Sequence, residues 1–250
     1  MSRTPVTLEM PEGHCPVSIF RPDTGTGPWF AVLFFMDGIG IRPALFEMGE
    51  RLAAHGYLVL LPDLFYRQGP YTAPDPKELF SDPELRQTWF GKYIGSTTHA
   101  RVKEDTGAYL DFLAAQPDVV QPKVGTTGYC MGGGFSLAAA GNFPDRVAAA
   151  ASYHGGRLAT DAPDSPHLLA PRIEARVYVA GAVEDASFPD DMKQRLDDAL
   201  TKAGVAHTVE TYPGARHGWV PSDTPVHDPA AAERHWATLF ALLDGALRRA

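Results

Sequence analysis

Cysteine is scarce in this sequence, which has only Cys15 and Cys130 among 250 residues. Two distant cysteines do not make a disulfide framework, and they fit a reducing compartment. Long apolar runs are also missing, since the longest covers residues 29–36, whereas a membrane-spanning helix needs about 18 or more apolar residues. The sequence does not open with a basic segment followed by an apolar one, so no secretory signal is visible. These absences predict a cytoplasmic protein with no membrane partner.

Basic residues are fewer than acidic ones, with 22 Lys and Arg against 30 Asp and Glu and a formal net charge of −8. No local basic cluster offsets this balance, so nucleic acid is not an expected partner. The sequence has no HExxH, paired CxxC or GxGxxG motif, which argues against a metal or dinucleotide enzyme. It also has no repeat or linker-like change in composition, and we therefore expect one domain over residues 1–250. No motif tells a monomer from a dimer.

Apolar runs alternate with helical patterns along the chain. Residues 29–36 and 57–61 are short apolar runs, typical of strands buried on both faces. Between them Leu45, Met48 and Leu52 recur at helical spacing, so the segment predicts a unit of strand, helix and strand. The alternation continues with strands expected at 123–127, 147–153, 176–180 and 207–212, and helices at 102–113, 135–141, 189–203 and 229–243.

This alternation predicts an α/β fold with a mostly parallel central sheet and helices on both faces. Residues 6–10 and 17–20 are expected to add antiparallel strands at one edge. The proline-rich span 68–83 is too irregular for a linker, and we interpret it as an excursion from a compact body. Such loops often shape binding sites.

A candidate nucleophile stands at the end of one predicted strand. The segment from Gly128 to Gly132 reads G-x-C-x-G, with Cys130 at its centre, between a strand and a helix. A sharp turn there would hold the central side chain strained and exposed, and larger residues in place of the glycines would collide with backbone. The helix N-terminus favours a thiolate and a developing oxyanion. Alternatively, Cys130 is a small buried apolar residue beside a tight turn.

The partners of a catalytic triad follow in the order nucleophile, acid, histidine, as in α/β-hydrolases. Asp185 follows the strand at 176–180, and His217 follows the strand at 207–212. The carboxyl ends of parallel strands face one crevice, so the three loops can converge on one site. His217 is one of nine histidines and Asp185 has the alternative role of a helix cap. Three neighbouring carboxylates are alternative acids, namely Glu184, Asp190 and Asp191.

Several motifs spread over most of the chain point to one family. They are DGIG at 37–40, HGY at 55–57, LPDLF at 61–65, GYCMGG at 128–133 and GARH at 214–217, together with Asp185 and Pro189. In these motifs the sequence resembles the dienelactone hydrolase family, whose members are α/β-hydrolases with a cysteine nucleophile. The resemblance implies hydrolysis of small esters or lactones through a thioester on Cys130, with His217 as base and Asp185 orienting it. It also implies that N–H groups of Met131 and Gly38 hold the oxyanion, and that no cofactor or metal takes part.

Two positions depart from the family pattern. Asp37 stands where the family has a glutamate that contacts and activates the resting cysteine, and Pro221 stands where it has a substrate-binding arginine. Asp37 is therefore the candidate activating residue, although its side chain is one methylene shorter. Arg86, Arg216 and Trp219 are the candidates for substrate binding. Other aromatic residues that could wall an apolar pocket are Tyr66, Tyr71, Trp89, Phe90 and Tyr93.

Two other functions stay open on the sequence alone. One is a catalytically silent hydrolase fold that binds a small ligand or a partner, in which the shortened Asp37 leaves the thiol protonated. The other is a broad carboxylesterase or thioesterase. Ester turnover by the protein and by its Cys130→Ala and His217→Ala variants separates an enzyme from a silent fold.

Overall fold

The computed structural model describes residues 2–248, and the strands within them form a single sheet. Its eight strands there have the order β1-β2-β4-β3-β5-β6-β7-β8. β1 and β2 are antiparallel and form one edge, while β4, β3, β5, β6, β7 and β8 pair with one another in parallel. The strands are β1 (Ser2–Met10), β2 (Gly13–Arg21), β3 (Ala31–Phe35), β4 (Leu58–Pro62), β5 (Val124–Tyr129), β6 (Val147–Tyr153), β7 (Arg176–Gly181) and β8 (His207–Thr211). The expected mostly parallel sheet is confirmed, and its two edge strands are longer than the pattern indicated.

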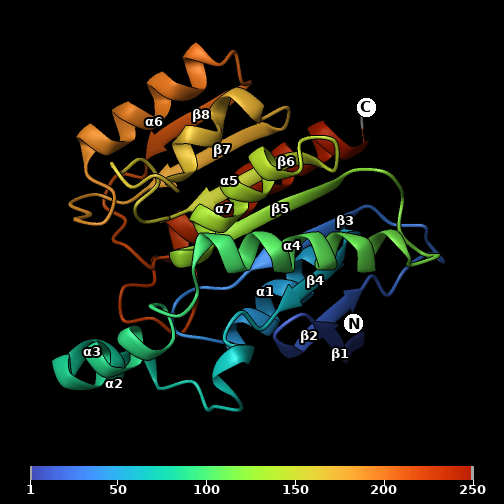
Figure 1. Ribbon diagram of the computed structural model, residues 1–250, viewed down its shortest axis with the longest axis horizontal. Helices are drawn as coiled ribbons and strands as arrows, with labels where there is room; N and C mark the ends of the chain where they lie inside the picture. The colour runs from blue at the N-terminus through green and yellow to red at the C-terminus, as the bar shows by residue number, and fades with distance from the viewer. Residues whose placement is uncertain (1, 249–250) are drawn as a thin grey trace.

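Helices cover both faces of this sheet (Figure 1). α4 and α5 pack against each other on one face, and α1 and α7 lie on the other, where Arg51 pairs with Glu233 at 2.6 Å. The long helices are α1 (Pro43–Ala54), α4 (His99–Ala114), α5 (Met131–Asn142), α6 (Asp190–Lys202) and α7 (Pro229–Leu243). Shorter helical turns are η1 (Tyr66–Gln68), η2 (Pro166–Arg172) and η3 (Asp244–Arg248). The predicted three-layer α/β fold is therefore confirmed.

The central strands are buried along their whole length. Every residue of β3, β4 and β5 is buried, because helices cover both of their faces. This explains why their sequences are continuous apolar or small-residue runs instead of alternating patterns. The core formed in this way holds the carboxyl ends of the parallel strands at one edge, on the left-hand side of Figure 1.

Two short helices that the sequence analysis did not predict begin within the proline-rich excursion of residues 68–83. α2 (Pro76–Ser81) and α3 (Pro83–Lys92) each begin with proline after an aspartate cap. The Asp75 carboxylate accepts the N–H of Lys77 at 2.7 Å, and the Asp82 carboxylate accepts the N–H of Glu84 at 2.9 Å. Figure 1 shows α2 and α3 projecting from the body near the carboxyl edge of the sheet. The caps were readable from the sequence, but the short length of each helix hid the apolar period.

The helices of residues 2–248 are all too short or too polar to cross a membrane.

Candidate active site

Cys130 occupies a sharp turn between β5 and α5. Its φ of 53° and ψ of −115° are rarely adopted by a residue with a side chain. A Cβ on Gly128 would lie 1.9 Å from the carbonyl oxygen of Gly132, and a Cβ on Gly132 would lie 2.4 Å from the carbonyl oxygen of Phe35. Both positions therefore require glycine, as the G-x-C-x-G pattern suggested. The turn leaves the thiol of Cys130 only partly buried.

His217 and Asp185 meet at the same edge of the sheet. His217, in the loop after β8, has its Nδ1 atom 2.7 Å from Oδ2 of Asp185, which lies in the loop after β7. The other oxygen of Asp185 accepts hydrogen bonds from the hydroxyl of Ser187 at 2.6 Å and from its N–H at 2.9 Å. The alternative acids do not share this contact, since Glu184 and Asp191 are exposed and Asp190 pairs with Lys193.

The charges of this pair follow from their surroundings. Burial alone would lower the pKa of His217, but the sulfur of Cys130 and the carboxylate of Asp185 raise it to about 10. Burial opposes ionisation of Asp185, yet the hydrogen bond and the charge of His217, together with the donors of Ser187, lower its pKa to about 2. At neutral pH the imidazole is therefore protonated and stands between a carboxylate and the sulfur.

Asp37 is held by a residue that the sequence analysis missed. Arg42 donates to both of its carboxylate oxygens, at 2.8 and 2.9 Å, and the same guanidinium donates to Asp223 at 2.7 Å. The N–H of Ile39 also reaches the Asp37 carboxylate at 3.0 Å. Among residues 2–248 no hydrogen bond joins Asp37 to Cys130, so the structure places the expected activating carboxylate in a buried ion pair. No signal in the sequence links Arg42 with the distant Asp223.

Gly38 and Met131 lie on segments that pack together. Gly132, the second residue of α5, approaches the end of β3 so closely that a side chain would not fit, and the loop that starts there contains Gly38. The carbonyl of Gly38 accepts the indole N–H of Trp89 at 3.1 Å. A Cβ on Gly38 would lie 2.5 Å from the side chain of Ile94. The excursion that carries α3 therefore fixes the loop next to Cys130.

The three candidates for substrate binding have different surroundings. Arg86 donates to the carbonyl of Phe80 at 3.3 Å within the α2–α3 excursion, and Arg216 is exposed beside His217. Trp219 is fully buried, and its ring lies 4.9 Å from that of His154. Trp219 is therefore part of the core beneath the site, because a side chain with no exposed surface does not line an open pocket.

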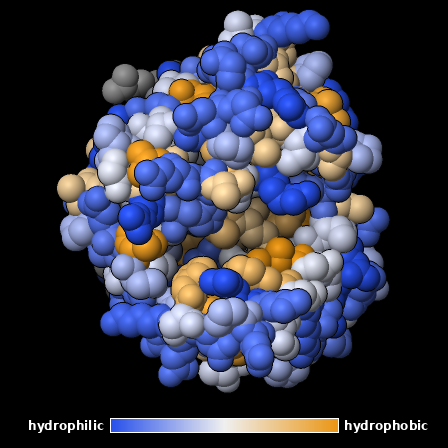
Figure 2. All heavy atoms as spheres, turned by 90° about the vertical axis from the view of Figure 1, so that its left-hand side faces the viewer, coloured by the Kyte–Doolittle hydropathy of each residue, from blue (hydrophilic) through white to orange (hydrophobic). Residues whose placement is uncertain are grey.

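Aromatic side chains gather beside the loop that follows β3. Neighbouring ring centroids in this cluster lie between 4.1 and 6.5 Å apart. Its members are Phe65, Tyr71, Trp89 and Tyr93. Figure 2 looks at the carboxyl edge of the sheet and shows a hollow near the centre of this face, with apolar surface around it. The remaining aromatic candidates lie elsewhere, since Phe90 pairs with Phe80 and Tyr66 donates to Asp105.

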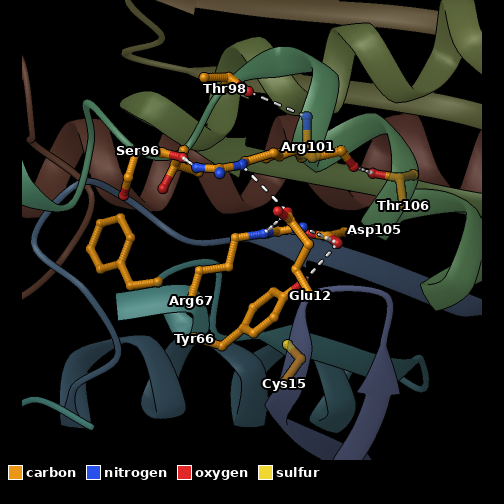
Figure 3. A network of polar contacts seen from close by, with 12 residues as sticks. Glu12, Cys15, Tyr66, Arg67, Ser96, Thr98, Arg101, Asp105 and Thr106 are labelled. Atoms are coloured by element: carbon orange, nitrogen blue, oxygen red, sulfur yellow. Dashed lines mark hydrogen bonds and ion pairs between the residues drawn. The ribbon is translucent and has the colours of Figure 1, made fainter. Parts of the chain in front are cut away.

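The second cysteine has a different environment. Cys15 is completely buried, and burial raises the pKa of its thiol to about 12. Its sulfur lies 3.3 Å from the hydroxyl of Tyr109. Figure 3 shows Cys15 beside a network in which Arg67 joins Glu12 to Asp105. A buried, protonated thiol is a poor nucleophile, so Cys130 is the reactive candidate of the two.

No group of three His, Cys, Asp or Glu side chains in residues 2–248 is arranged to hold a metal ion.

The sheet order, the turn at Cys130 and the loops that carry Asp185 and His217 define a protein of the α/β-hydrolase fold. The chain matches the model of the Dienelactone hydrolase family over residues 16–247 and belongs to that family of hydrolases. A Synechocystis protein named "Putative carboxymethylenebutenolidase" is 26% identical over 89% of this chain and 88% of its own length.

Solved structures show the same fold. A Klebsiella pneumoniae structure named "Putative Dienelactone Hydrolase" covers 97% of this chain and 98% of its own, with a TM-score of 0.84 and 23% identity. A dienelactone hydrolase-like promiscuous phosphotriesterase, P91 from metagenomic libraries, covers 98% of this chain and 99% of its own, with a TM-score of 0.76 and 25% identity. The predicted family and fold are thereby confirmed.

Proposed function

We propose that this protein hydrolyses small esters or lactones with Cys130 as nucleophile, His217 as acid and base, and Asp185 orienting the imidazole. The observation that supports this most directly is the position of His217, which contacts Asp185 at 2.7 Å and has its pKa raised to about 10 by Cys130 and Asp185 together, although burial opposes the change. The carboxymethylenebutenolidase name of curated relatives agrees with a lactone or ester substrate.

The reaction begins with the sulfur of Cys130 attacking the carbonyl carbon of the substrate. The thiolate is the attacking form of a cysteine. The carbonyl π electrons move to oxygen, and the resulting oxyanion accepts hydrogen bonds from the N–H groups of Met131 and Gly38. Removing one such donor typically costs about 10²-fold or more in rate.

Collapse of the tetrahedral intermediate breaks the bond to the alcohol oxygen. His217 gives its proton to that oxygen, and a thioester remains on Cys130. His217 then takes a proton from water, whose oxygen attacks the thioester carbonyl. Departure of the thiolate releases the acid and restores the thiolate beside a protonated imidazole. Asp185, held by Ser187 through two hydrogen bonds, keeps the ring oriented in both halves of the cycle.

The test is turnover of p-nitrophenyl acetate and of a simple lactone by the wild type, Cys130→Ala and His217→Ala. Each variant is expected to lose about 10³-fold or more in kcat, as single triad substitutions do. Cys15→Ala is the matched control, because it removes the other thiol, which is fully buried. The proposal requires that Cys15→Ala lose less activity than Cys130→Ala.

Thiol labelling gives an independent result. A short pulse of iodoacetamide followed by mass spectrometry should label Cys130 well before Cys15, because Cys15 is fully buried. Wild-type protein that turns over neither substrate, or turnover that survives both triad substitutions, would favour a catalytically silent fold. Turnover of esters and thioesters without lactones would favour the broad esterase.

A further inference from the structure

A second imidazole lies against the nucleophile. His154 follows β6 directly, and its side chain is buried, with 1% of its surface exposed. Its Nδ1 atom accepts the backbone N–H of Cys130 at 3.1 Å, and the same N–H also donates to the carbonyl of Tyr153 at 3.2 Å. The centroid of the His154 ring lies 5.3 Å from that of His217. The sequence analysis gave His154 no role, although it stands at the end of a parallel strand like the triad residues.

The contact with Cys130 fixes the protonation of His154. A ring nitrogen that accepts an N–H carries no proton, so the proton of the neutral ring is on Nε2. Burial lowers the pKa of His154 well below its usual range, and the charges of His217 and His235 lower it further, while Asp185 acts in the opposite direction. Two neighbouring imidazoles therefore differ, because His217 is protonated and His154 is neutral.

This tautomer places the ring proton of His154 on a buried nitrogen. Nε2 of His154 is buried and has no hydrogen-bond partner among the described residues. A buried N–H without a partner destabilises a fold, so its presence in a native structure needs an explanation. Here the constraint is the other nitrogen of the same ring, which is engaged by the amide of Cys130.

The two joined residues both have unusual backbone conformations. Cys130 has a φ of 53° and His154 a φ of 41°, in the left-handed region that side chains disfavour. The turns around them also pack tightly, since a Cβ on Gly133 would lie 2.8 Å from Cα of Gly155. Conformations of this kind persist only where the surroundings over-determine them, and the bond from the Cys130 amide to the His154 ring is one such restraint.

We propose that His154 is a positioning residue, whose neutral imidazole holds the backbone N–H of Cys130 and so fixes the sulfur against His217. The proposal rests on the proposed function for its catalytic consequence. A displacement of a reacting group by about 1 Å can lower a rate by about 10²-fold, so loss of this contact affects kcat more than substrate binding.

Two substitutions separate the acceptor from the ring. His154→Phe keeps an aromatic ring beside Trp219 but removes the ring acceptor, so that the Cys130 amide keeps only the carbonyl of Tyr153. His154→Asn loses the ring, but its amide oxygen is an acceptor close to the place of Nδ1, and asparagine tolerates a positive φ. His55→Phe is the matched control. His55 lies just before β4, at the amino ends of the parallel strands and therefore away from the candidate site, and it pairs with Asp244.

The measurements are kcat and KM for p-nitrophenyl acetate, the rate of alkylation of Cys130 by iodoacetamide at pH 7, and the melting temperature. His154→Phe should lose about 10²-fold in kcat with a much smaller change in KM, and its Cys130 should be alkylated more slowly. His154→Asn should recover at least about tenfold of both rates. His55→Phe should alter only the melting temperature.

Wild-type rates in His154→Phe, or rates in His154→Asn as slow as those in His154→Phe, would overturn the proposal. If the phenylalanine variant does not fold, His154→Leu takes its place and must differ from His154→Asn in the same way. Alkylation does not depend on ester turnover. Wild-type protein without esterase activity would therefore refute the proposed function, while the alkylation rates of the variants would still decide the role of His154.

Discussion

Arg42→Met removes the guanidinium that joins two loops of the site. In the protein, Arg42 forms two hydrogen bonds to Asp37 and two to Asp223. The Asp37 side chain is only 4% exposed, so the substitution would leave a buried carboxylate without its partner. Breaking a buried pair in this way costs about 3–5 kcal/mol. The Asp223 side chain is 31% exposed, so water can solvate it once Arg42 is removed. Losing the Arg42–Asp223 pair therefore adds at most about 1 kcal/mol to the loss of stability.

The expected loss is measurable by urea unfolding followed by circular dichroism. For a protein of this size, a loss of about 3–5 kcal/mol lowers the melting temperature by roughly 6–20 °C. The double variant Asp37→Leu/Arg42→Met should recover most of this loss, because it leaves no unpaired buried charge. The N–H of Ile39 loses its acceptor in the double variant, at a cost of about 1 kcal/mol. A loss below about 1 kcal/mol in Arg42→Met, or a double variant no more stable than the single one, would refute this reasoning.

The same double variant tests the activating role that the family resemblance gave to Asp37. Alkylation of Cys130 by iodoacetamide at pH 7 reports the reactivity of the thiol. Because Arg42 engages both oxygens of Asp37, we expect a folded double variant to be alkylated at the wild-type rate. A much slower rate would favour activation of Cys130 by Asp37.

Two further outcomes follow from the site. Gly132→Ala should lower the free energy of unfolding by about 1–3 kcal/mol, because its Cβ would lie 2.4 Å from a backbone oxygen of β3. Gly91→Ala is the control: its Cβ would have no atom within 4 Å, so the change should be neutral or stabilising by about 0.5–1 kcal/mol. Equal losses of stability for the two variants in urea unfolding would contradict this. The pKa of His217 is raised from 6.5 to about 10, so its contribution to stability is complete below about pH 6.5 and is lost as pH rises through about 10. The pKa of Asp185 is lowered from 3.8 to about 2, so its contribution is present above about pH 3.8 and is lost as pH falls through about 2. Urea unfolding at stepped pH should show both declines, and an alkaline decline of the same size in His217→Gln would show that another group causes it.

Much of the fold could be predicted from the sequence because its signals are local. Buried parallel strands are apolar along their whole length, and the helices between them carry an apolar stripe, so the α/β class was visible in the order of these patterns. The helices α2 and α3 were not predicted, since neither is long enough to show a clear period. The local signals were their caps, Asp75 and Asp82, each followed by a proline.

The positions of the candidate site residues in the fold were predictable where one short segment or one strand end carried the information. The turn at Cys130 needs glycines at fixed positions, and Asp185 and His217 each follow a strand. Trp219 follows a strand too, but its burial in the core depends on packing with His154, which no local pattern reports.

The sequence by itself determined the layers, the parallel sheet and the placing of Cys130, Asp185 and His217 after three of its strands, because strand and turn preferences act over a few neighbouring residues. The tertiary structure alone decided which polar groups pair across the site. Asp37 pairs with Arg42, and Arg42 also pairs with Asp223, which lies 181 residues further along the chain. The amide of Cys130 donates a hydrogen bond to the ring of His154. Such pairings depend on burial and on the distance between atoms of separate loops, and those quantities exist only after the sheet has brought the loops together.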